Sequence, residues 1–298
     1  MRPRISAVIN TLNEEKNLPY ALGSVHPWVD EIIVVDMYSD DKTVDIAREF
    51  GAKVFFHERL GFADPARAFA LEQATGDWIL MLDADEMIPY SLSRELIALA
   101  SSDVGDVAQI HRMSYWFGSP LMHTNTGPHQ DRTYRFFRRG HILATPAIHN
   151  FFHPLPGSRV FELKYKPGLA IVHFAYVDSQ DFIEKLDRYT GIEARQAWER
   201  GEEISLLKIF FKVGKELGLR YVKGGALLDG WRGAYVTLLY IFYVIVSAGK
   251  LYELAALGGG QKIESTYRQE AESFLKDYTT SAASVSEPAS GSFLNHGY

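Results

Sequence analysis

The most constraining feature of the chain is an apolar run that ends in two carboxylates. Residues 78–82, Trp-Ile-Leu-Met-Leu, are typical of a strand buried on both faces of a parallel sheet. Asp83 and Asp85 follow, and side chains two apart in an extended segment point the same way. Such paired hard oxygen ligands suit Mg²⁺ or Mn²⁺ that already holds a diphosphate. For an isolated Asp-x-Asp a strand end that caps the next helix would be the better interpretation, so the upstream residues decide.

The first hundred residues alternate between short apolar segments and segments of helical character. We expect strands at residues 5–9, 32–35, 52–56 and 78–82. We expect helices that open at 13–15 and run towards residue 25, that run from an N-cap at Ser39 to residue 50, and that span 64–74. Such alternation predicts an α/β fold with a parallel sheet, whose ligands bind beyond the carboxyl ends of the strands. Polar clusters at residues 11–14, 36–41 and 83–86 follow three of these strands.

Composition and missing motifs exclude several classes of protein. The 31 basic and 37 acidic residues give a net charge of −6, so no nucleic-acid-binding signature exists. The chain has no cysteine, which excludes disulfides and thiolate chemistry and fits a reducing compartment. Neither a dinucleotide-binding G-x-G-x-x-G after the first strand nor a P-loop is present. The first residues lack the apolar core of a signal peptide, so we expect a cytoplasmic location.

Three segments, in order and spacing, resemble the family 2 glycosyltransferases of GT-A fold. They are TLNEEKNL, EIIVVDMYSDDKTVDIAREFGAKVF and ARAFALEQATGDWILMLDADE. The close match covers residues 4–90 and a looser one continues to residue 255. Within the family the chain looks most like bacterial enzymes related to lipopolysaccharide-core β-1,4-glucosyltransferases. The resemblance implies a Rossmann-like, mostly parallel sheet with helices on both faces, a nucleotide-sugar donor (a UDP-sugar is favoured) and a glycan, lipid-linked or lipopolysaccharide-type acceptor.

The resemblance also implies which residues bind the nucleotide-sugar. Thr11, Asn13 and Glu14 would line the nucleobase pocket, and Asp36 would bind the base or the ribose. Arg67 would face the diphosphate, because a guanidinium can hold phosphate oxygens in a fork. For Asn13 a helix cap, and for Arg67 an exposed helix charge, are the alternative interpretations. Relatives often have Asn after this arginine, whereas this chain has Ala68, so one donor contact is missing or comes from elsewhere.

A divalent metal, Mn²⁺ or Mg²⁺, is the cofactor that the resemblance implies. Asp85 would be its principal ligand, and Asp83 would lie near the ribose and the metal. His173 follows an expected strand at 169–172, matches a family histidine and could approach the diphosphate and its metal. Inversion at the transferred sugar also follows from the resemblance and not from residue spacing.

Residues of the middle of the chain are expected to serve the acceptor. A strand is predicted at residues 107–117, followed by a long loop, 118–130, of a length that is usually functional. Asp131 opens the segment DRTYRFFRRG, which resembles the family's Asp-then-Arg-Phe-Phe-Arg segment, and is our first choice for the catalytic base. The arginines of this segment could contact phosphates or lie on a solvated edge strand. The alternative interpretation of Asp131 is an ordinary turn residue that starts a strand. His149 is the second choice, weakened by Asn150 where relatives tend to have Glu.

The chain is expected to be helical from Asp178 onward. One face of the predicted helix is an apolar stripe formed by Leu206, Phe210, Val213 and Leu217. Another face carries Lys208, Lys212 and Lys215. Residues 233–249 carry no charge and could form a buried helix, a membrane span or a surface-bound helix. We favour attachment to the inner surface of the cytoplasmic membrane. The expected organisation is a catalytic domain at 1–175, a membrane-associating helical region at 176–278 and a disordered tail at 279–298.

Two rival functions share these features. A sugar nucleotidyltransferase would use the same nucleotide-binding sheet and metal, but would release pyrophosphate. A non-catalytic sugar-nucleotide-binding module at the membrane would fit Ala68 and Asn150, although the intact pair Asp83 and Asp85 speaks against it. A homo-oligomer is left open.

Overall fold

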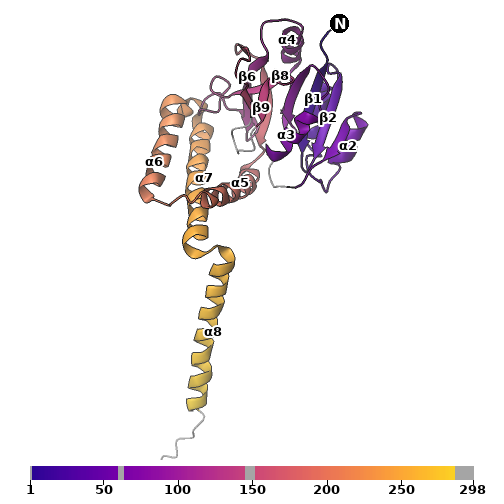
Figure 1. Cartoon of the computed structure of the whole chain (residues 1–298). Coiled ribbons are helices and arrows are strands. Elements are labelled where there is room, and N and C mark those ends of the chain that lie inside the picture. The colour runs from indigo at the N-terminus through magenta and orange to yellow at the C-terminus, as the bar shows by residue number, and fades with distance from the viewer. Residues whose placement is uncertain (1, 60–63, 145–151, 286–298) are drawn as a thin grey trace, which may run out of the picture.

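The computed structural model describes residues 2–59, 64–144 and 152–285. In these segments a mixed sheet of ten strands forms the centre, in the order β3-β2-β1-β4-β8-β6-β12-β5, with β7 and β11 paired to β6. Helices cover it on both faces, and a helical region follows at its carboxyl-terminal side (Figure 1). The expected α/β architecture, a mostly parallel sheet with helices on both faces, is confirmed.

The parallel half of the sheet comes from the strand–helix units of the first hundred residues. Strands β1 (Ile5–Thr11), β2 (Glu31–Asp36), β3 (Lys53–Phe56) and β4 (Trp78–Asp83) lie parallel, with β1 between β2 and β4. Helices α1 (Leu18–Val25), α2 (Thr43–Glu49), α3 (Asp64–Glu72) and α4 (Tyr90–Ala100) connect or follow them. Successive side chains of β1 and β4 enter two separate apolar clusters, one on each face of the sheet. Continuous apolar runs are therefore needed in these strands.

The second half of the sheet is mixed and brings distant segments to the carboxyl ends of the first. Strand β8 (Arg132–Arg138) lies antiparallel between β4 and β6 (Val107–Trp116), and β12 (Ala170–Tyr176) is parallel to β6. The short strands are β7 (Ser119–Pro120), β9 (Ile142–Ala144), β10 (Phe152–Pro154) and β11 (Val160–Glu162), and β9 pairs with β10 in a separate sheet. The arginines of β8 therefore do not lie on an edge strand, which was one of the two interpretations.

Strand β5 (Glu86–Met87) explains how the site is assembled. It follows β4 after only two residues, yet it pairs antiparallel with β12 at the other end of the strand order. The chain between β4 and β5 must therefore cross the strand ends. As a result the backbone N–H of Phe174 in β12 donates to the carbonyl of Asp85 at 3.0 Å.

Some local expectations were wrong. Ser39 does not cap α2, which begins at Thr43, because the Ser39 hydroxyl is bonded to Asp36 instead. His173 lies inside β12 and not after the end of a strand, since β12 continues to Tyr176. Helix α1 begins at Leu18, because turns occupy the residues before it, where we expected the helix to open.

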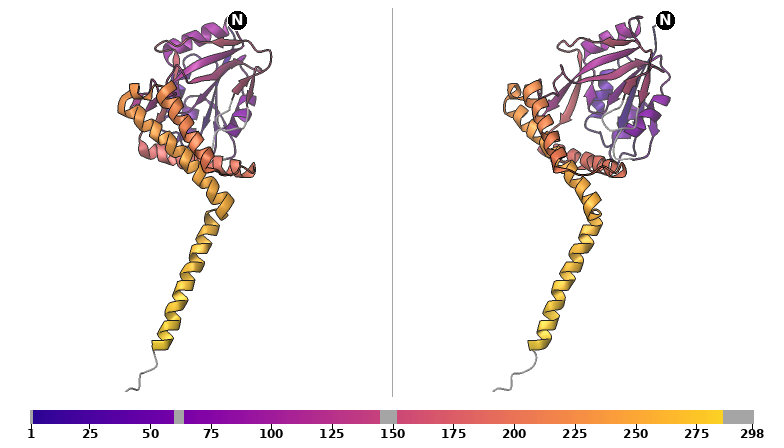
Figure 2. Two further views of the ribbon diagram at one scale, coloured as in Figure 1. Left: turned by 90° about the vertical axis from the view of Figure 1, so that its left-hand side faces the viewer. Right: turned by 60° about the vertical axis from the view of Figure 1, so that its left-hand side comes forward.

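The C-terminal third is helical, as expected. It contains α5 (Ser179–Glu199), α6 (Leu206–Leu217), the short turns η1 (Gly218–Lys223) and η2 (Ala226–Asp229), α7 (Gly230–Leu257) and α8 (Gly260–Val285). Helices α5 and α6 pack against α7, while α8 extends away from the rest of the molecule (Figure 2). Residues 279–285, which we expected to be disordered, continue α8, and residues 286–298 lie outside the described part.

Two side chains, Asp229 and Arg220, tie the long loop at residues 118–130 to this helical region. The carboxylate of Asp229 in η2 accepts from the backbone N–H groups of Met122 and His123 at 3.2 and 2.8 Å. The buried guanidinium of Arg220 in η1 donates to the carbonyl of Thr124 at 2.9 Å. The C-terminal helices therefore fix the loop that leads directly into Asp131.

Candidate active site

Asp83, at the carboxyl end of β4, lies between two buried arginines. Nη2 of Arg67 in α3 donates to its Oδ1 at 2.6 Å, and the guanidinium of Arg135 in β8 reaches both of its oxygens. Arg135 is 1% exposed and Arg67 is 5% exposed, so both need a counter-charge. Burial alone would raise the pKa of Asp83, but Arg135 and Arg67 outweigh it and hold that pKa far below its ordinary range.

This ion pair belongs to a larger network that sequence reasoning did not identify. Nη1 of Arg112 in β6 donates to fully buried Glu86 at 3.2 Å, and its Nε donates to Asp131 at 2.9 Å. Arg135 also lies 3.6 Å from Glu86. Three arginines thus face three carboxylates, so the formal charges of the network cancel: Arg67, Arg112 and Arg135 against Asp83, Glu86 and Asp131.

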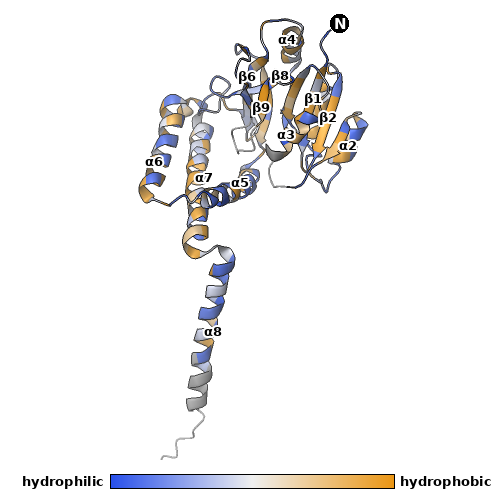
Figure 3. Ribbon diagram, in the orientation of Figure 1, coloured by the Kyte–Doolittle hydropathy of each residue, from blue (hydrophilic) through white to orange (hydrophobic). Residues whose placement is uncertain are grey.

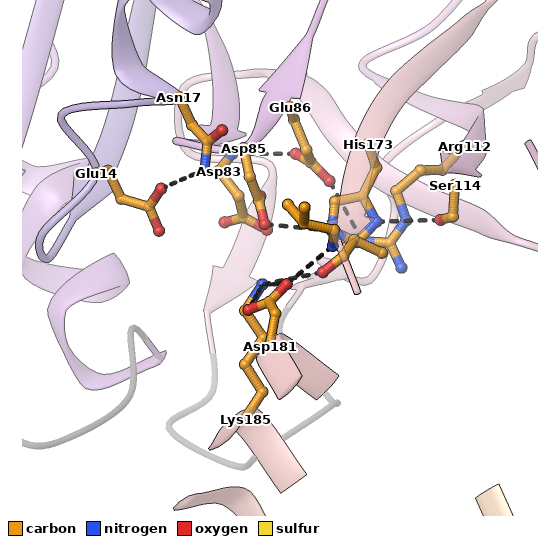
Figure 4. Close-up of polar contacts among 12 residues, drawn as sticks. Glu14, Asn17, Asp83, Asp85, Glu86, Arg112, Ser114, His173, Asp181 and Lys185 are labelled. Carbon is orange, nitrogen blue, oxygen red and sulfur yellow. Dashed lines mark hydrogen bonds and ion pairs between the residues drawn. The ribbon is translucent and has the colours of Figure 1, made fainter. Parts of the chain in front are cut away.

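Asp85 is paired with His173 and, among the described residues, with none of the arginines of this network. Nε2 of His173 lies 3.6 Å from Oδ2 of Asp85, and Nδ1 of His173 shares a hydrogen bond of 3.0 Å with the hydroxyl of Ser114 in β6 (Figure 4). Both side chains are 19% exposed. Burial would raise the pKa of Asp85, but the neighbouring His173 lowers it on balance.

These positions allow a test of the expected metal site. Within the described residues no group of three or more His, Cys, Asp or Glu side chains is arranged to hold a metal ion. Asp85 and His173 supply one carboxylate and one imidazole on facing segments, a donor pair that Mn²⁺ accepts readily. The oxygens of Asp83 are instead occupied by arginine donors. The two residues would therefore fit Mn²⁺ or Mg²⁺ as a pair of protein ligands.

The residues expected to bind the nucleobase join the loops that follow β1 and β2. Fully buried Asp36 accepts from the Thr11 hydroxyl at 2.9 Å and from both the N–H and the hydroxyl of Ser39. Asn13, with a positive φ of 57°, accepts from the N–H of Asp40 at 2.8 Å and donates its own N–H to the Ser39 hydroxyl. Asn13 is therefore not a helix cap. Because Thr11 and Ser39 donate to Asp36, direct contact between Asp36 and a ligand requires movement of these neighbours.

Glu14 is the residue of that loop that approaches the metal side of the site. Its carboxylate accepts from Nδ2 of Asn17 at 2.8 Å (Figure 4). Burial and the negative charge of Asp85 raise its pKa to about 7, against the opposing effects of Asn17, Lys185 and Arg188. The charge of Asp85 and those of Lys185 and Arg188 in α5 therefore all influence the ionisation of Glu14.

Other predicted residues are only partly placed. Arg67 is not an exposed helix charge, since it is buried against Asp83. Arg138 lies at the opposite end of β8, where it pairs with Asp103 and Asp106. His149 and Asn150 lie outside the described residues.

Comparisons with known proteins place the chain in a family. The model of glycosyl transferase family 2 matches residues 6–159, which is more than half of the chain, so the protein belongs to that family. An uncharacterized glycosyltransferase of Rickettsia typhi is 42% identical over 267 residues, covering 85% of this chain and 88% of that protein. A second, from Rickettsia bellii, is 28% identical over 264 residues, covering 85% and 87%. The protein is thus a glycosyltransferase.

A similar solved structure is glucosyl-3-phosphoglycerate synthase from Mycobacterium tuberculosis in complex with Mn²⁺ and UDP. It has 26% sequence identity and a TM-score of 0.32, and the match covers 38% of this chain and 44% of that one. Family membership favours glycosyl transfer over the nucleotidyl transfer that we considered. The narrower resemblance to lipopolysaccharide-core glucosyltransferases stays a prediction.

Proposed function

We propose that the protein transfers a sugar from a nucleoside-diphosphate sugar, preferably a UDP-sugar, to a lipid-linked or lipopolysaccharide-type acceptor with inversion. The observation that carries this proposal is the pairing of Asp85, which follows the carboxyl end of β4, with His173 inside β12, next to Glu14 in the loop that follows β1. Ligands of open α/β sheets bind at this edge, next to the loops after the first strands.

Asp85 and His173 would hold Mn²⁺ or Mg²⁺. When bound, such an ion neutralises negative charge on the leaving diphosphate. Asp83 has a different task, because its two arginine partners make it the anchor that fixes the segment between β4 and β5. That segment carries Asp85, so the arginine network sets the position of the metal-binding carboxylate.

Asp131 would accept the proton of the acceptor hydroxyl. Its Oδ2 is held by Nε of Arg112, whereas Oδ1 has no donor among the described residues and can accept a proton. The backbone pairing of Arg112 N–H with the Asp131 carbonyl at 2.9 Å fixes the residue at the end of the long loop. His149 remains the alternative base.

The helices beside this loop would bring the enzyme to the inner surface of the cytoplasmic membrane. The helical segment Ala226–Leu257 has the length and composition to cross a membrane, with a mean hydropathy of 1.6 over its most apolar window. Only 17% of that window is buried inside the protein, so most of its apolar surface is open to a membrane. Figure 3 shows apolar residues along α6 and α7. In α6 no residue is buried, and Leu206, Leu207, Phe210 and Phe211 are 65–74% exposed.

A helix with a continuous exposed apolar stripe beside lysines is suited to lie in a membrane interface. In α6 the lysines at 208, 212 and 215 lie beside that stripe, so they can meet anionic headgroups while the apolar side chains enter the bilayer. The hydrogen bonds from η1 and η2 to residues 122–124 link the loop that we assign to the acceptor to the helices that would meet the membrane. This arrangement supports a lipid-linked acceptor.

The activity can be tested with a panel of nucleotide-sugars and Mn²⁺, with slow donor hydrolysis followed as release of the nucleoside diphosphate. We expect release from one donor class, and none from the Asp85→Asn variant. Pyrophosphate release from a nucleoside triphosphate and a sugar phosphate would instead indicate nucleotidyl transfer. Binding without turnover, even with membrane glycolipid extracts added, would indicate a binding module.

A further inference from the structure

Helix α5 carries a polar face that lies over the active site and has no assigned role. The helix starts directly after β12, so its first turns stand beside His173 and Asp85. Its buried face packs on the rest of the fold through Phe182, Leu186, Thr190, Ala194 and Ala197. Residues 181, 185 and 188 have helical spacing and form a polar stripe on another face of α5. Figure 4 shows Asp181 and Lys185 of this stripe near Asp85.

Lys185 is fixed in place but retains binding capacity. Its Nζ donates to the carbonyl of Ala175 at 2.9 Å and to Asp181, whose Oδ1 lies at 3.3 Å. Asp181 is itself held by the N–H of Val177 at 3.1 Å. An ammonium group has three N–H donors. Apart from the ring of Tyr176, whose centroid lies 5.1 Å from Nζ, no acceptor for the third occurs among the described residues, and the side chain is 27% exposed.

The arginines nearest to the site are committed to carboxylates and supply little charge to a ligand. Arg67, which we expected to face the diphosphate, is buried against Asp83. Arg112 and Arg135 are balanced by Glu86, Asp131 and Asp83. Apart from the metal, a donor diphosphate beside Asp85 must therefore obtain positive charge from another element of the chain.

Lys185 and Arg188 are the cations that fill this gap. Lys185 lies near Asp85 in Figure 4, and Arg188 follows it by three residues, about one turn further along the same stripe of α5. The guanidinium of Arg188 stands over the ring of Tyr189 at 5.2 Å, which orients it on the same stripe.

We propose that Lys185 and Arg188 form the binding site for the diphosphate of the donor and stabilise it as the leaving group. This inference rests on the proposed function. As the acceptor oxygen bonds to the anomeric carbon, the bond from that carbon to the phosphate oxygen breaks, and its electron pair stays on the diphosphate. The acceptor proton goes to the catalytic carboxylate. The charge that develops on the diphosphate then faces a fixed ammonium and a guanidinium.

The test compares UDP with uridine on the full chain, with and without Mn²⁺. Calorimetry gives the UDP affinity, and ligand-observed NMR gives the uridine affinity. We expect Lys185→Met and Arg188→Met each to weaken UDP binding about tenfold, the size of one charge-assisted hydrogen bond, and to leave uridine binding unchanged. Lys185→Arg should restore most of the UDP affinity. Lys262→Met, which removes an exposed lysine on distant α8, is the matched charge control.

The outcomes separate this inference from the function on which it rests. If wild-type protein binds neither UDP nor another nucleoside diphosphate, both the function and the inference fail. If the wild type binds UDP and both methionine variants, folded by circular dichroism, bind it equally well, only the inference fails. Equal losses for UDP and uridine would show that the two cations merely hold α5 in place and would also overturn it. Arg188→Met is informative even if Lys185→Met loosens the start of α5.

Discussion

Arg135 and Asp83 are 52 residues apart in the chain and form an ion pair between the neighbouring strands β8 and β4. Arg135 has almost no exposed surface, and Glu86, 3.6 Å from it, has none. The pair therefore joins the antiparallel half of the sheet to the parallel half at the point where the chain turns towards Asp85. Breaking it has consequences for both stability and the site.

Arg135→Met should destabilise the fold by about 3 to 5 kcal/mol, because removing one partner leaves buried carboxylates without compensation. Urea unfolding followed by circular dichroism measures this change. Arg94→Met in α4 removes an exposed arginine and is the matched control, with little expected effect. A loss for Arg135→Met no larger than that of the control would contradict the role that we assign to the pair.

The carboxylates at 83 and 85 should respond differently to the same substitution. Asp85→Asn should leave the fold intact and abolish the Mn²⁺-dependent part of nucleoside-diphosphate binding, because Asp85 contacts no arginine among the described residues and pairs with His173. Asp83→Asn should lower stability, because it removes the counter-charge of Arg67 and Arg135. Calorimetry of UDP with and without Mn²⁺, paired with urea unfolding, measures both effects. Unchanged Mn²⁺-dependent affinity in folded Asp85→Asn would refute the assignment of Asp85.

The contrast between these two residues shows what the sequence could predict. The apolar run 78–82 and the alternation of strands and helices were enough to predict the parallel half of the sheet, because strand alternation and burial are local properties. The partner of Asp83 was not predictable in this way. Arg135 reaches Asp83 only because β8 inserts antiparallel beside β4, and no local pattern specifies that pairing.

Two further differences have the same origin. Ser39 has the residue type and position of an N-cap. Its hydroxyl donates to Asp36 instead, because a fully buried carboxylate requires hydrogen-bond donors. The sequence pattern did not predict a functional role for Lys185, because lysines are common on amphipathic helices. Its helical spacing from Asp181 was visible, but the position of α5 over the strand ends was not.

Glu31, near the start of β2, should make stability depend on acid pH. It is buried and accepts from Ser6, Lys53 and Thr75 at 2.6, 2.7 and 2.9 Å. Burial opposes its ionisation, but these donors outweigh that effect and lower its pKa from 4.5 to about 2. A depressed pKa in the folded state means that Glu31 contributes its full stability above pH 4.5 and loses it as the pH falls towards 2.

Glu31→Gln should therefore cost about 1 to 3 kcal/mol at neutral pH, the range for a hydrogen-bond network that loses a buried charged acceptor. The difference from wild type should shrink between pH 4.5 and 2. Urea unfolding at a series of pH values measures it, with exposed Glu95→Gln in α4 as the control. A difference that stays constant across this range would show that ionised Glu31 is not the group involved.

Membrane attachment through α6 should be peripheral and salt-dependent. We expect the protein to float with vesicles that contain anionic lipid and to be released, at least in part, by high salt or carbonate. Replacing Lys208, Lys212 and Lys215 by Glu should abolish flotation, whereas Lys262→Glu in α8 should not. Complete resistance to both washes would indicate that α7 spans the bilayer. A wild-type protein that never floats would contradict membrane attachment altogether.

Asp131 should be required for turnover and not for donor binding. An inverting transferase needs a proton acceptor within hydrogen-bond reach of the attacking hydroxyl, and Oδ1 of Asp131 is open for that role while Arg112 fixes Oδ2. Asp131→Asn keeps the shape of the side chain and should lower turnover by roughly 10²- to 10⁴-fold, with UDP and Mn²⁺ affinities near those of wild type. Because Asp131 also balances Arg112, unfolding of the variant must be measured in parallel. Near-normal turnover in a folded Asp131→Asn protein would assign the proton transfer to His149 or to another acid.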